Sequence, residues 1–209
     1  MSGLPLLSLA IFTPLVGALL ILFIPRDRVA LTRWVALGFS LVALAFSLAL
    51  LPGFHADAPG FQYVEVVPWI PAFGIDYRVG VDGISLLLVI LTTLLTSVSI
   101  LASFRPITDR VKEYMISFLV LEVGMLGVFA ALDLFLFYIF WEVVLVPMYL
   151  IIGIWGGANR VYATIKFVLY TLVGSLLMLI AILATAFAYQ TGHGGSWAGA
   201  FDYSSLAAW

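Results

Sequence analysis

The sequence predicts an all-α membrane protein, a polytopic bundle of six transmembrane helices with one β-hairpin-like external loop. Hydrophobic residues make up 64% of the 209 residues, and the mean hydropathy is +1.20. Charged residues make up only 10% of the chain, whereas about a quarter is usual in a water-soluble domain. Six segments also reach the roughly 20 mostly apolar residues that a helix needs to cross a bilayer.

Each expected span is an apolar run bounded by proline, glycine or charged residues. The spans cover residues 6–24, 30–51, 84–104, 114–131, 134–155 and 161–188. Residues 1–209 then form a single membrane domain surrounded by the lipid bilayer. The first span has no basic residue ahead of it and no small-residue cleavage pattern behind it, so we expect a retained helix and not a signal peptide.

The one long connection, residues 52–83, is expected to form the external loop. Phe61–Val67 and Ile75–Val81 are β-prone runs, and the Pro/Gly-containing stretch Pro68–Gly74 lies between them. This pattern is typical of a hairpin. Asp82 then stands where a side-chain cap for the third span is wanted.

The positions of lysine and arginine predict how the chain is oriented. Eight of the nine cations lie in or beside the loops that join spans one and two, three and four, and five and six, and only Arg78 lies on the other side. Because cytoplasmic loops of membrane proteins carry the excess of Lys and Arg, these three loops are expected in the cytoplasm. We therefore expect a bacterial inner-membrane protein with a periplasmic N-terminus.

Composition also excludes several function classes. A formal charge of -2 argues against a nucleic-acid partner, which needs clustered cations. The chain has no cysteine, so disulfides, thiolate metal sites and cysteine nucleophiles are excluded. His55 and His193 lie far apart in polar segments. No cofactor, metal site or redox centre is therefore expected in this chain.

Three ionisable side chains, Glu122, Glu142 and Lys166, fall inside expected spans. Each costs about 2.5–3.5 kcal/mol on insertion scales and is by default a candidate functional residue. Lys166 lies about five residues from the end of its helix, so it either extends to the membrane surface or takes part in a proton relay. Both glutamates lie too deep for that extension. They are either hydrogen-bonded structural groups or members of a proton relay.

The two glutamates are expected at the same depth. A tight turn around Leu132 and Asp133 joins spans four and five, and each glutamate lies ten residues from Leu132. At 1.5 Å per residue, both are about 15 Å from the turn, near the bilayer midplane. A lateral proton relay would use this arrangement, although the spacing does not say whether the carboxyls face each other.

Two further residues bear on Glu142. Pro147 frees the carbonyl of Val143 beside it, which indicates either an ordinary kink or a locally hydrated bend. By the same helical rise, Lys166 differs from Glu142 in depth by roughly 12 Å, so we expect no direct ion pair.

Several runs of residues resemble one known family. They are LEVGMLGVFAALDLFLFYIFWEVVLVPMYL at 121–150 with IGIWGG at 152–157, VGVDGISLLL at 79–88 and IKFVLYTLVGS at 165–175. They are similar to the antiporter-like membrane subunits of proton-pumping NADH-quinone oxidoreductase, in particular to the chain M or complex I subunit 4 family. The resemblance covers nearly the whole chain, and the Phe-Trp-Glu to Pro-Met-Tyr block is its most specific part.

The resemblance implies a fold of about fourteen helices with two inverted repeats, and a proton path made of glutamate and lysine side chains. Glu142 matches the family's fifth-helix glutamate, and Glu122 matches a fourth-helix glutamate. The complex is an enzyme, a translocase, but this subunit would hold no redox site. NADH, FMN, iron–sulfur clusters and quinone would bind in partner subunits, and the other membrane-arm subunits would be its partners.

The chain departs from that pattern because it stops at Trp209, after six spans. We therefore expect a fragment that lacks the lysines on the family's seventh and eighth helices. Lys166 lies too close to the end of its helix to take their place in the proton path. Two alternatives stay open. One is the equivalent subunit of a multisubunit Na⁺/H⁺ antiporter or membrane-bound hydrogenase, and the other is a structural membrane module without a proton path.

Overall fold

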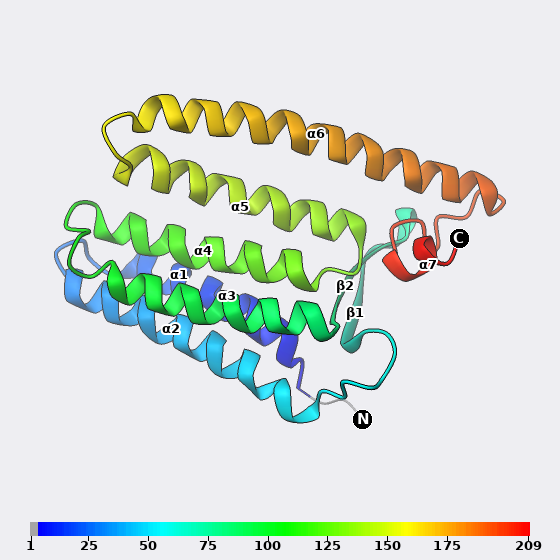
Figure 1. Ribbon diagram of the computed structural model, residues 1–209, viewed down its shortest axis with the longest axis horizontal. Coiled ribbons are helices and arrows are strands. Elements are labelled where there is room, and N and C mark those ends of the chain that lie inside the picture. Colours follow the sequence, from blue (N-terminus) through cyan, green and yellow to red (C-terminus); the bar gives the residue numbers. More distant parts are fainter. Residues whose placement is uncertain (1–3) are drawn as a thin grey trace.

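The computed structural model describes residues 4–209, in which six helices are long and apolar enough to cross a membrane. They lie side by side along one axis, with a two-stranded sheet at one end (Figure 1). The predicted six-helix membrane bundle with a hairpin is therefore confirmed. The long helices are α1 Leu6–Phe23, α2 Val29–Ala49, α3 Gly83–Ala102, α4 Val111–Ala130, α5 Leu134–Trp155 and α6 Arg160–Gly192.

Helices α1 to α4 form a close group, α5 packs on α4, and α6 packs on α5 at the edge of the molecule (Figure 1). Two buried apolar clusters fill the four-helix group. One includes Leu7, Val89 and Leu126, and the other includes Ile21, Ile100 and Leu119. The turns α1–α2, α3–α4 and α5–α6 lie together at one end of the bundle, which we call the cation-rich end.

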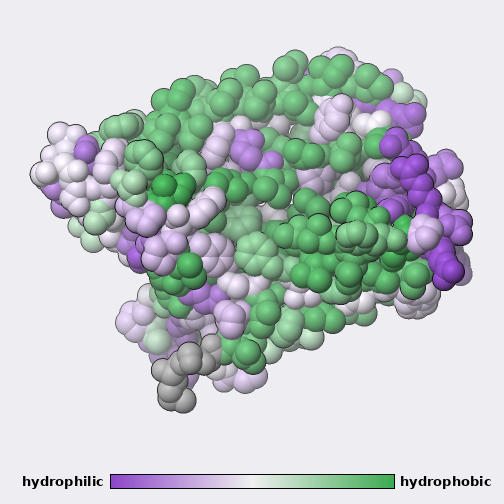
Figure 2. Space-filling model, turned by 180° about the vertical axis from the view of Figure 1, so that it is seen from behind, coloured by the Kyte–Doolittle hydropathy of each residue, from purple (hydrophilic) through white to green (hydrophobic). Residues whose placement is uncertain are grey.

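The helix exteriors are broadly apolar, and hydrophilic residues gather at the ends of the molecule (Figure 2). Large hydrophobic side chains are exposed along α3 and α6, among them Leu87 and Leu177. Burial of such surface against lipid or protein is favourable, whereas exposure to water is not. The surface pattern therefore suits a protein that lies within a membrane.

The hairpin consists of β1 (Gln62–Ile70) and β2 (Ile75–Val81), which pair antiparallel with Val67 opposite Tyr77. Its bend is shorter than expected, because Pro68 lies within β1 and the turn is the short helix η2 (Pro71–Phe73) followed by Gly74. Both strands of a two-stranded sheet are edge strands, where proline is tolerated. Gly74 has φ +65, and a Cβ there would come within 2.1 Å of the Trp197 carbonyl oxygen.

Glu65 of β1 anchors the hairpin to the start of α1. Its carboxylate accepts hydrogen bonds from the amides of Leu7 (3.0 Å) and Ser8 (3.2 Å) and from the Ser8 hydroxyl. The Ser8 hydroxyl also hydrogen-bonds with the Tyr77 hydroxyl at 2.7 Å. Pro5, the residue before α1, provides no side-chain cap, so Glu65 supplies it from another element. Burial raises the pKa of Tyr77 to about 12.

Asp82 caps α3, as the sequence predicts. Its side chain accepts the Ser85 amide at 2.7 Å, and the Ser85 hydroxyl accepts the Asp82 amide at 2.8 Å. These reciprocal bonds form a capping box and satisfy amides that a helix start leaves free. The Ser85 amide holds the pKa of Asp82 below its usual value.

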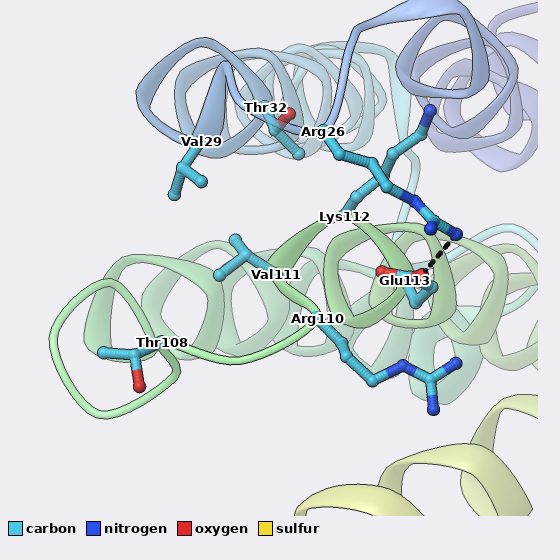
Figure 3. A pocket seen from close by; sticks show the side chains of 8 residues that line it. All are labelled: Arg26, Val29, Thr32, Thr108, Arg110, Val111, Lys112 and Glu113. Atoms are coloured by element: carbon cyan, nitrogen blue, oxygen red, sulfur yellow. Dashed lines mark hydrogen bonds and ion pairs between the residues drawn. The ribbon is translucent and has the colours of Figure 1, made fainter.

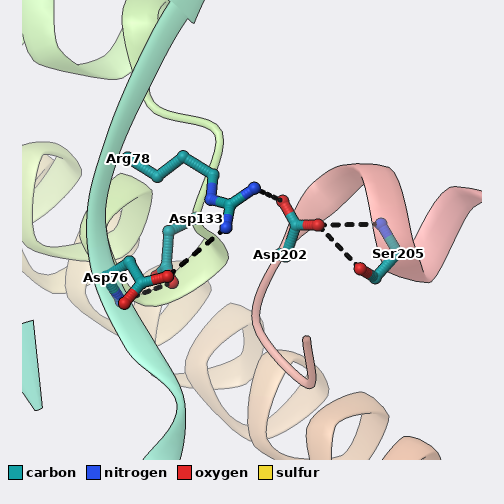
Figure 4. A network of polar contacts seen from close by, with 5 residues as sticks. All are labelled: Asp76, Arg78, Asp133, Asp202 and Ser205. Carbon is teal, nitrogen blue, oxygen red and sulfur yellow. Dashed lines mark hydrogen bonds and ion pairs between the residues drawn. The ribbon is translucent and has the colours of Figure 1, made fainter. Parts of the chain in front are cut away.

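The α4–α5 turn is fixed between β2 and the end of the chain (Figure 4). Asp133 caps α5 by accepting the amides of Phe135 and Leu136, and its other oxygen accepts the Asp76 amide at 3.2 Å. Burial raises the pKa of Asp133. Arg78 bridges Asp76 at 3.4 Å and Asp202 at 3.3 Å. This network ties three segments that are distant in sequence.

The segment after residue 189 folds back over the end of the bundle that carries the hairpin (Figure 1). Helix α6 continues to Gly192, and a short helix α7 forms over Tyr203–Ala207. Asp202 caps α7 by accepting the Ser205 amide at 3.1 Å. The Leu134 amide also donates to the Phe201 carbonyl at 2.8 Å, so this segment packs on the α4–α5 turn.

Candidate functional site

Glu142 lies in the middle of α5 and faces α6. It lines a cavity of about 320 Å³ together with Val168, Thr171 and Leu172 of α6. The side chain is half-buried. Within the described chain its Oε1 atom is buried and accepts no hydrogen bond. The residue thus borders a cavity, and one of its carboxyl oxygens has no hydrogen-bond donor among the described residues.

Two hydroxyl side chains extend the polar environment of Glu142. The Tyr138 hydroxyl approaches both the Glu142 carboxylate and the hydroxyl of Ser175 on α6, and Ser175 is buried. Sequence reasoning missed both residues. The signal for Tyr138 was its position four residues before Glu142, which places both side chains on one face of a helix.

Glu122 is fully buried in α4. It lies on the same stripe of the helix as Leu119, three residues earlier, and Leu126, four residues later. These two leucines belong to the two apolar clusters of the α1–α4 group. Among residues 4–209, no hydrogen-bond partner reaches either Glu122 carboxyl oxygen. The carboxyl therefore sits between the two clusters, on the inner side of the four-helix group.

Glycines bring α4 and α5 into close contact and define which faces meet. A Cβ on Gly124 would come within 2.6 Å of Val144, and a Cβ on Gly127 would come within 2.2 Å of the Phe140 ring. This fits the prominence of small residues at membrane helix interfaces. The face of α4 that carries these glycines therefore packs directly on Phe140 and Val144 of α5.

The two glutamates point away from this interface on opposite sides. Glu122 lies two residues before Gly124, and Glu142 lies two residues from both Phe140 and Val144. Two residues correspond to about 200° around an α-helix. Glu122 therefore faces α1–α3, Glu142 faces α6, and the packed α4–α5 contact lies between them.

The depths of the two glutamates agree with the sequence argument. Glu122 lies eight residues before the end of α4, and Glu142 lies eight residues after the start of α5. Each is about 12 Å from the turn by helical rise. They share a depth but not a direction, so the geometry does not bring them together as a carboxyl pair.

Lys166 lies six residues into α6, with an exposed side chain. Its Nζ atom is 5.9 Å from the ring centre of Tyr162. Across residues 4–209 the structure shows no ion pair of Lys166 with Glu142 or any other carboxylate. This placement is compatible with a side chain that extends to the membrane surface.

Pro147 is buried within α5, which continues through it to Trp155. Proline lacks the amide that would bond the carbonyl four residues earlier, here that of Val143. In a membrane such a carbonyl needs another partner. The Val143 carbonyl, which loses its usual helical donor to Pro147, therefore lies next to the Glu142 carboxyl, the group of the two that can exchange a proton.

Comparisons with known proteins agree with this architecture. The family described as NADH:quinone oxidoreductase/Mrp antiporter, transmembrane, matches residues 131–193. NADH-quinone oxidoreductase subunit M of Rhodobacter capsulatus is 51% identical over 185 residues, which cover 86% of this chain and 35% of that protein. NADH-ubiquinone oxidoreductase chain 4 of Marchantia polymorpha is 47% identical over 187 residues, which cover 89% and 37% respectively.

A solved structure supports the same relation. Respiratory complex I from Thermus thermophilus with bound NADH contains a chain that matches with a TM-score of 0.78 and 30% identity, over 97% of this chain and 39% of that chain. This chain thus spans little more than a third of the length of the curated relatives it matches. Most of this chain nevertheless aligns with these relatives, at 51% and 47% identity. The resemblance of this chain to NADH-quinone oxidoreductase subunit M and chain 4 is thus confirmed over most of its length.

Proposed function

We propose that the protein is a proton-translocating, non-redox membrane subunit of a respiratory NADH:quinone oxidoreductase. In this function, electron transfer from NADH to quinone drives proton movement through the membrane arm. The relatives at 51% and 47% identity carry the names of such subunits. NADH, FMN, the iron–sulfur clusters and quinone would bind in partner subunits, and the neighbouring membrane-arm subunits would be its protein partners.

Glu142 is the residue we propose as the proton carrier. The supporting observation is its combination of mid-helix depth, a buried free carboxyl oxygen and a position on a cavity between α5 and α6. A group that exchanges protons must reach a donor or acceptor within hydrogen-bond distance, directly or through one water. The cavity gives Glu142 that access.

Glu122 and Lys166 are less well placed than Glu142 to carry protons. Glu122 points into the α1–α4 group, so a transfer to Glu142 would have to pass around the packed α4–α5 contact. Lys166 is exposed near the end of α6. We therefore propose that Glu142 acts without Glu122 as its immediate partner, and that Lys166 lies outside the central step.

A second candidate is the equivalent subunit of a multisubunit Na⁺/H⁺ antiporter or membrane-bound hydrogenase. The description of the matching family, which names the Mrp antiporter as well, favours keeping it. The high identity to subunit M and chain 4 favours the respiratory enzyme. For either, we propose a bacterial inner membrane with the cation-rich end in the cytoplasm, as the distribution of Lys and Arg indicates.

Glu142→Gln in the full-length protein tests the proposal. Glutamine keeps the size and hydrogen-bonding capacity of the side chain but carries no exchangeable carboxyl proton. We expect the complex to assemble normally on native gels while proton pumping in proteoliposomes falls at least tenfold. Asp109→Asn, a matched change at an exposed loop residue, should leave pumping unchanged. Full pumping by an assembled Glu142→Gln complex would instead support a structural module.

A further inference from the structure

A second cavity, of about 480 Å³, opens at the cation-rich end between the α1–α2 turn and the start of α4 (Figure 3). It is separate from the Glu142 cavity, because the two share no lining residue. Its walls are formed by residues of the α1–α2 turn, α2, the α3–α4 turn and α4. They are Arg26, Val29, Thr32, Thr108, Arg110, Val111, Lys112 and Glu113.

The lining is basic. Arg26, Arg110 and Lys112 line the cavity together with one carboxylate, Glu113. The Arg110 side chain extends away from the other three (Figure 3), so Arg26 and Lys112 leave an excess of one positive charge beside Glu113. Lys112 is held in place because its Nζ donates to the carbonyls of Leu22 (2.9 Å) and Ile24 (2.8 Å) at the end of α1. A concave site with this excess attracts anions.

Glu113 occupies part of the cationic site. Arg26 reaches across to it, with Nη2 3.0 Å from Oε1, and the Arg26 side chain is 81% exposed. In Figure 3 the two side chains meet at the side of the cavity next to Lys112, whereas Arg110 extends away in another direction. An exposed ion pair contributes little to stability. An incoming anion can therefore replace the Glu113 carboxylate as the partner of Arg26.

Exposed apolar side chains of α1 lie close to this cavity, because Lys112 of its lining donates to the Leu22 carbonyl. Phe23 on the last turn of α1 is 84% exposed, and its neighbour Leu22 is 53% exposed. Trp34, near the start of α2, is 63% exposed, and tryptophans are enriched at the headgroup level of membranes. The cations thus lie beside the level of a lipid headgroup, with exposed hydrocarbon-like surface directly next to them.

We propose that this cavity binds the phosphate of an anionic phospholipid, with the acyl chains along the α1 surface at Leu22 and Phe23. Basic pockets at the ends of membrane helices are suited to such headgroups. A free phosphate ion would meet the same cations but make no use of the apolar surface. The site is independent of the proposed proton path, and its test does not depend on pumping.

Native mass spectrometry of the full-length protein, purified in its complex and stripped of loosely bound lipid, tests the proposal. The probes are phosphatidylglycerol, phosphatidylcholine and inorganic phosphate. We expect retention of phosphatidylglycerol over phosphatidylcholine. Each basic residue near an anionic lipid is worth about 1 kcal/mol, so Arg26→Gln should weaken phosphatidylglycerol binding about fivefold. Glu113→Gln should strengthen it, because a competing carboxylate is removed.

Arg105→Gln is the matched control, since Arg105 is an exposed cation of the same end that does not line the cavity. It should leave binding unchanged. An equal loss in Arg105→Gln and Arg26→Gln would show diffuse attraction and overturn the site. Equal retention of the two lipids would overturn it as well, as would displacement of phosphatidylglycerol by equimolar inorganic phosphate. Weaker phosphatidylglycerol binding by Glu113→Gln would contradict the proposal that the lipid phosphate replaces the Glu113 carboxylate as the partner of Arg26.

Discussion

At the scale of single residues, Glu65 supplies the N-terminal cap of α1 that the neighbouring residues do not provide. Helix α1 begins after Pro5, which cannot cap it, and the first amides of any helix need acceptors. Glu65, which lies 57 positions after Ser8, accepts the amides of Leu7 and Ser8. A negative charge at a helix start is also favourable to the helix dipole. The hairpin and α1 are thus joined by one carboxylate.

Glu65→Ala is expected to destabilise the full-length protein by about 1–2 kcal/mol, the usual cost of losing a helix cap. Glu65→Gln should cost less, because an amide oxygen still accepts the Leu7 and Ser8 amides. Thermal unfolding in detergent at neutral pH measures both changes. Asp57→Asn, an exposed acid in the same external segment, should leave the midpoint unchanged. A midpoint for Glu65→Ala equal to wild type would contradict the assigned cap.

At the scale of helices, the glycine contact between α4 and α5 decides where both glutamates point. Gly127→Ala would place a Cβ within 2.2 Å of the Phe140 ring. Such overpacking typically costs about 1–3 kcal/mol. Gly38→Ala in α2, where a Cβ meets nothing within 4 Å, should instead stabilise by about 0.5–1 kcal/mol, because alanine favours a helix. Opposite shifts of the unfolding midpoint are expected, and shifts of the same sign would refute the close contact.

The helices could be predicted from sequence because each is a continuous apolar run flanked by breakers, and the hairpin followed from β-prone runs around a Pro/Gly bend. The shared depth of Glu122 and Glu142 could also be predicted, because it depends only on the rise per helical residue and on the tight turn that joins the two helices. Their opposite directions depend on which faces of α4 and α5 meet. Gly124 and Gly127 mark the face of α4 that meets α5, but the residues of α5 that they contact, Phe140 and Val144, are known only from the structure.

Contacts between distant segments were beyond the sequence argument. Glu65 with Ser8, and Arg78 with Asp202, join residues 57 and 124 positions apart. Apolar periodicity contains no information on such pairs. Tyr138 and Ser175 were missed for the related reason that α6 had to be placed against α5 first. The depth of the candidate residue Glu142 could therefore be predicted from sequence, whereas its polar surroundings could not.

At the scale of the whole molecule, the two ends of the bundle differ in charge and in structure. The cation-rich end carries short turns, whereas the opposite end carries the hairpin, α7 and the Arg78 network (Figure 4). Because Lys and Arg are retained on the cytoplasmic side during insertion, this asymmetry predicts the direction in which the whole bundle is inserted. It also predicts that the Glu65 and Arg78 contacts form in the periplasm.

Cysteine labelling tests that direction without interference from these 209 residues, which contain no cysteine. Asp57→Cys lies in the external segment and Arg105→Cys lies at the cation-rich end, and both positions are exposed. In intact cells, a membrane-impermeant maleimide should label Asp57→Cys of the full-length protein and leave Arg105→Cys unlabelled. After permeabilisation both should react, while the parent protein gives the background. Labelling of Arg105→Cys alone in intact cells would reverse the orientation and place the basic lipid site on the periplasmic surface.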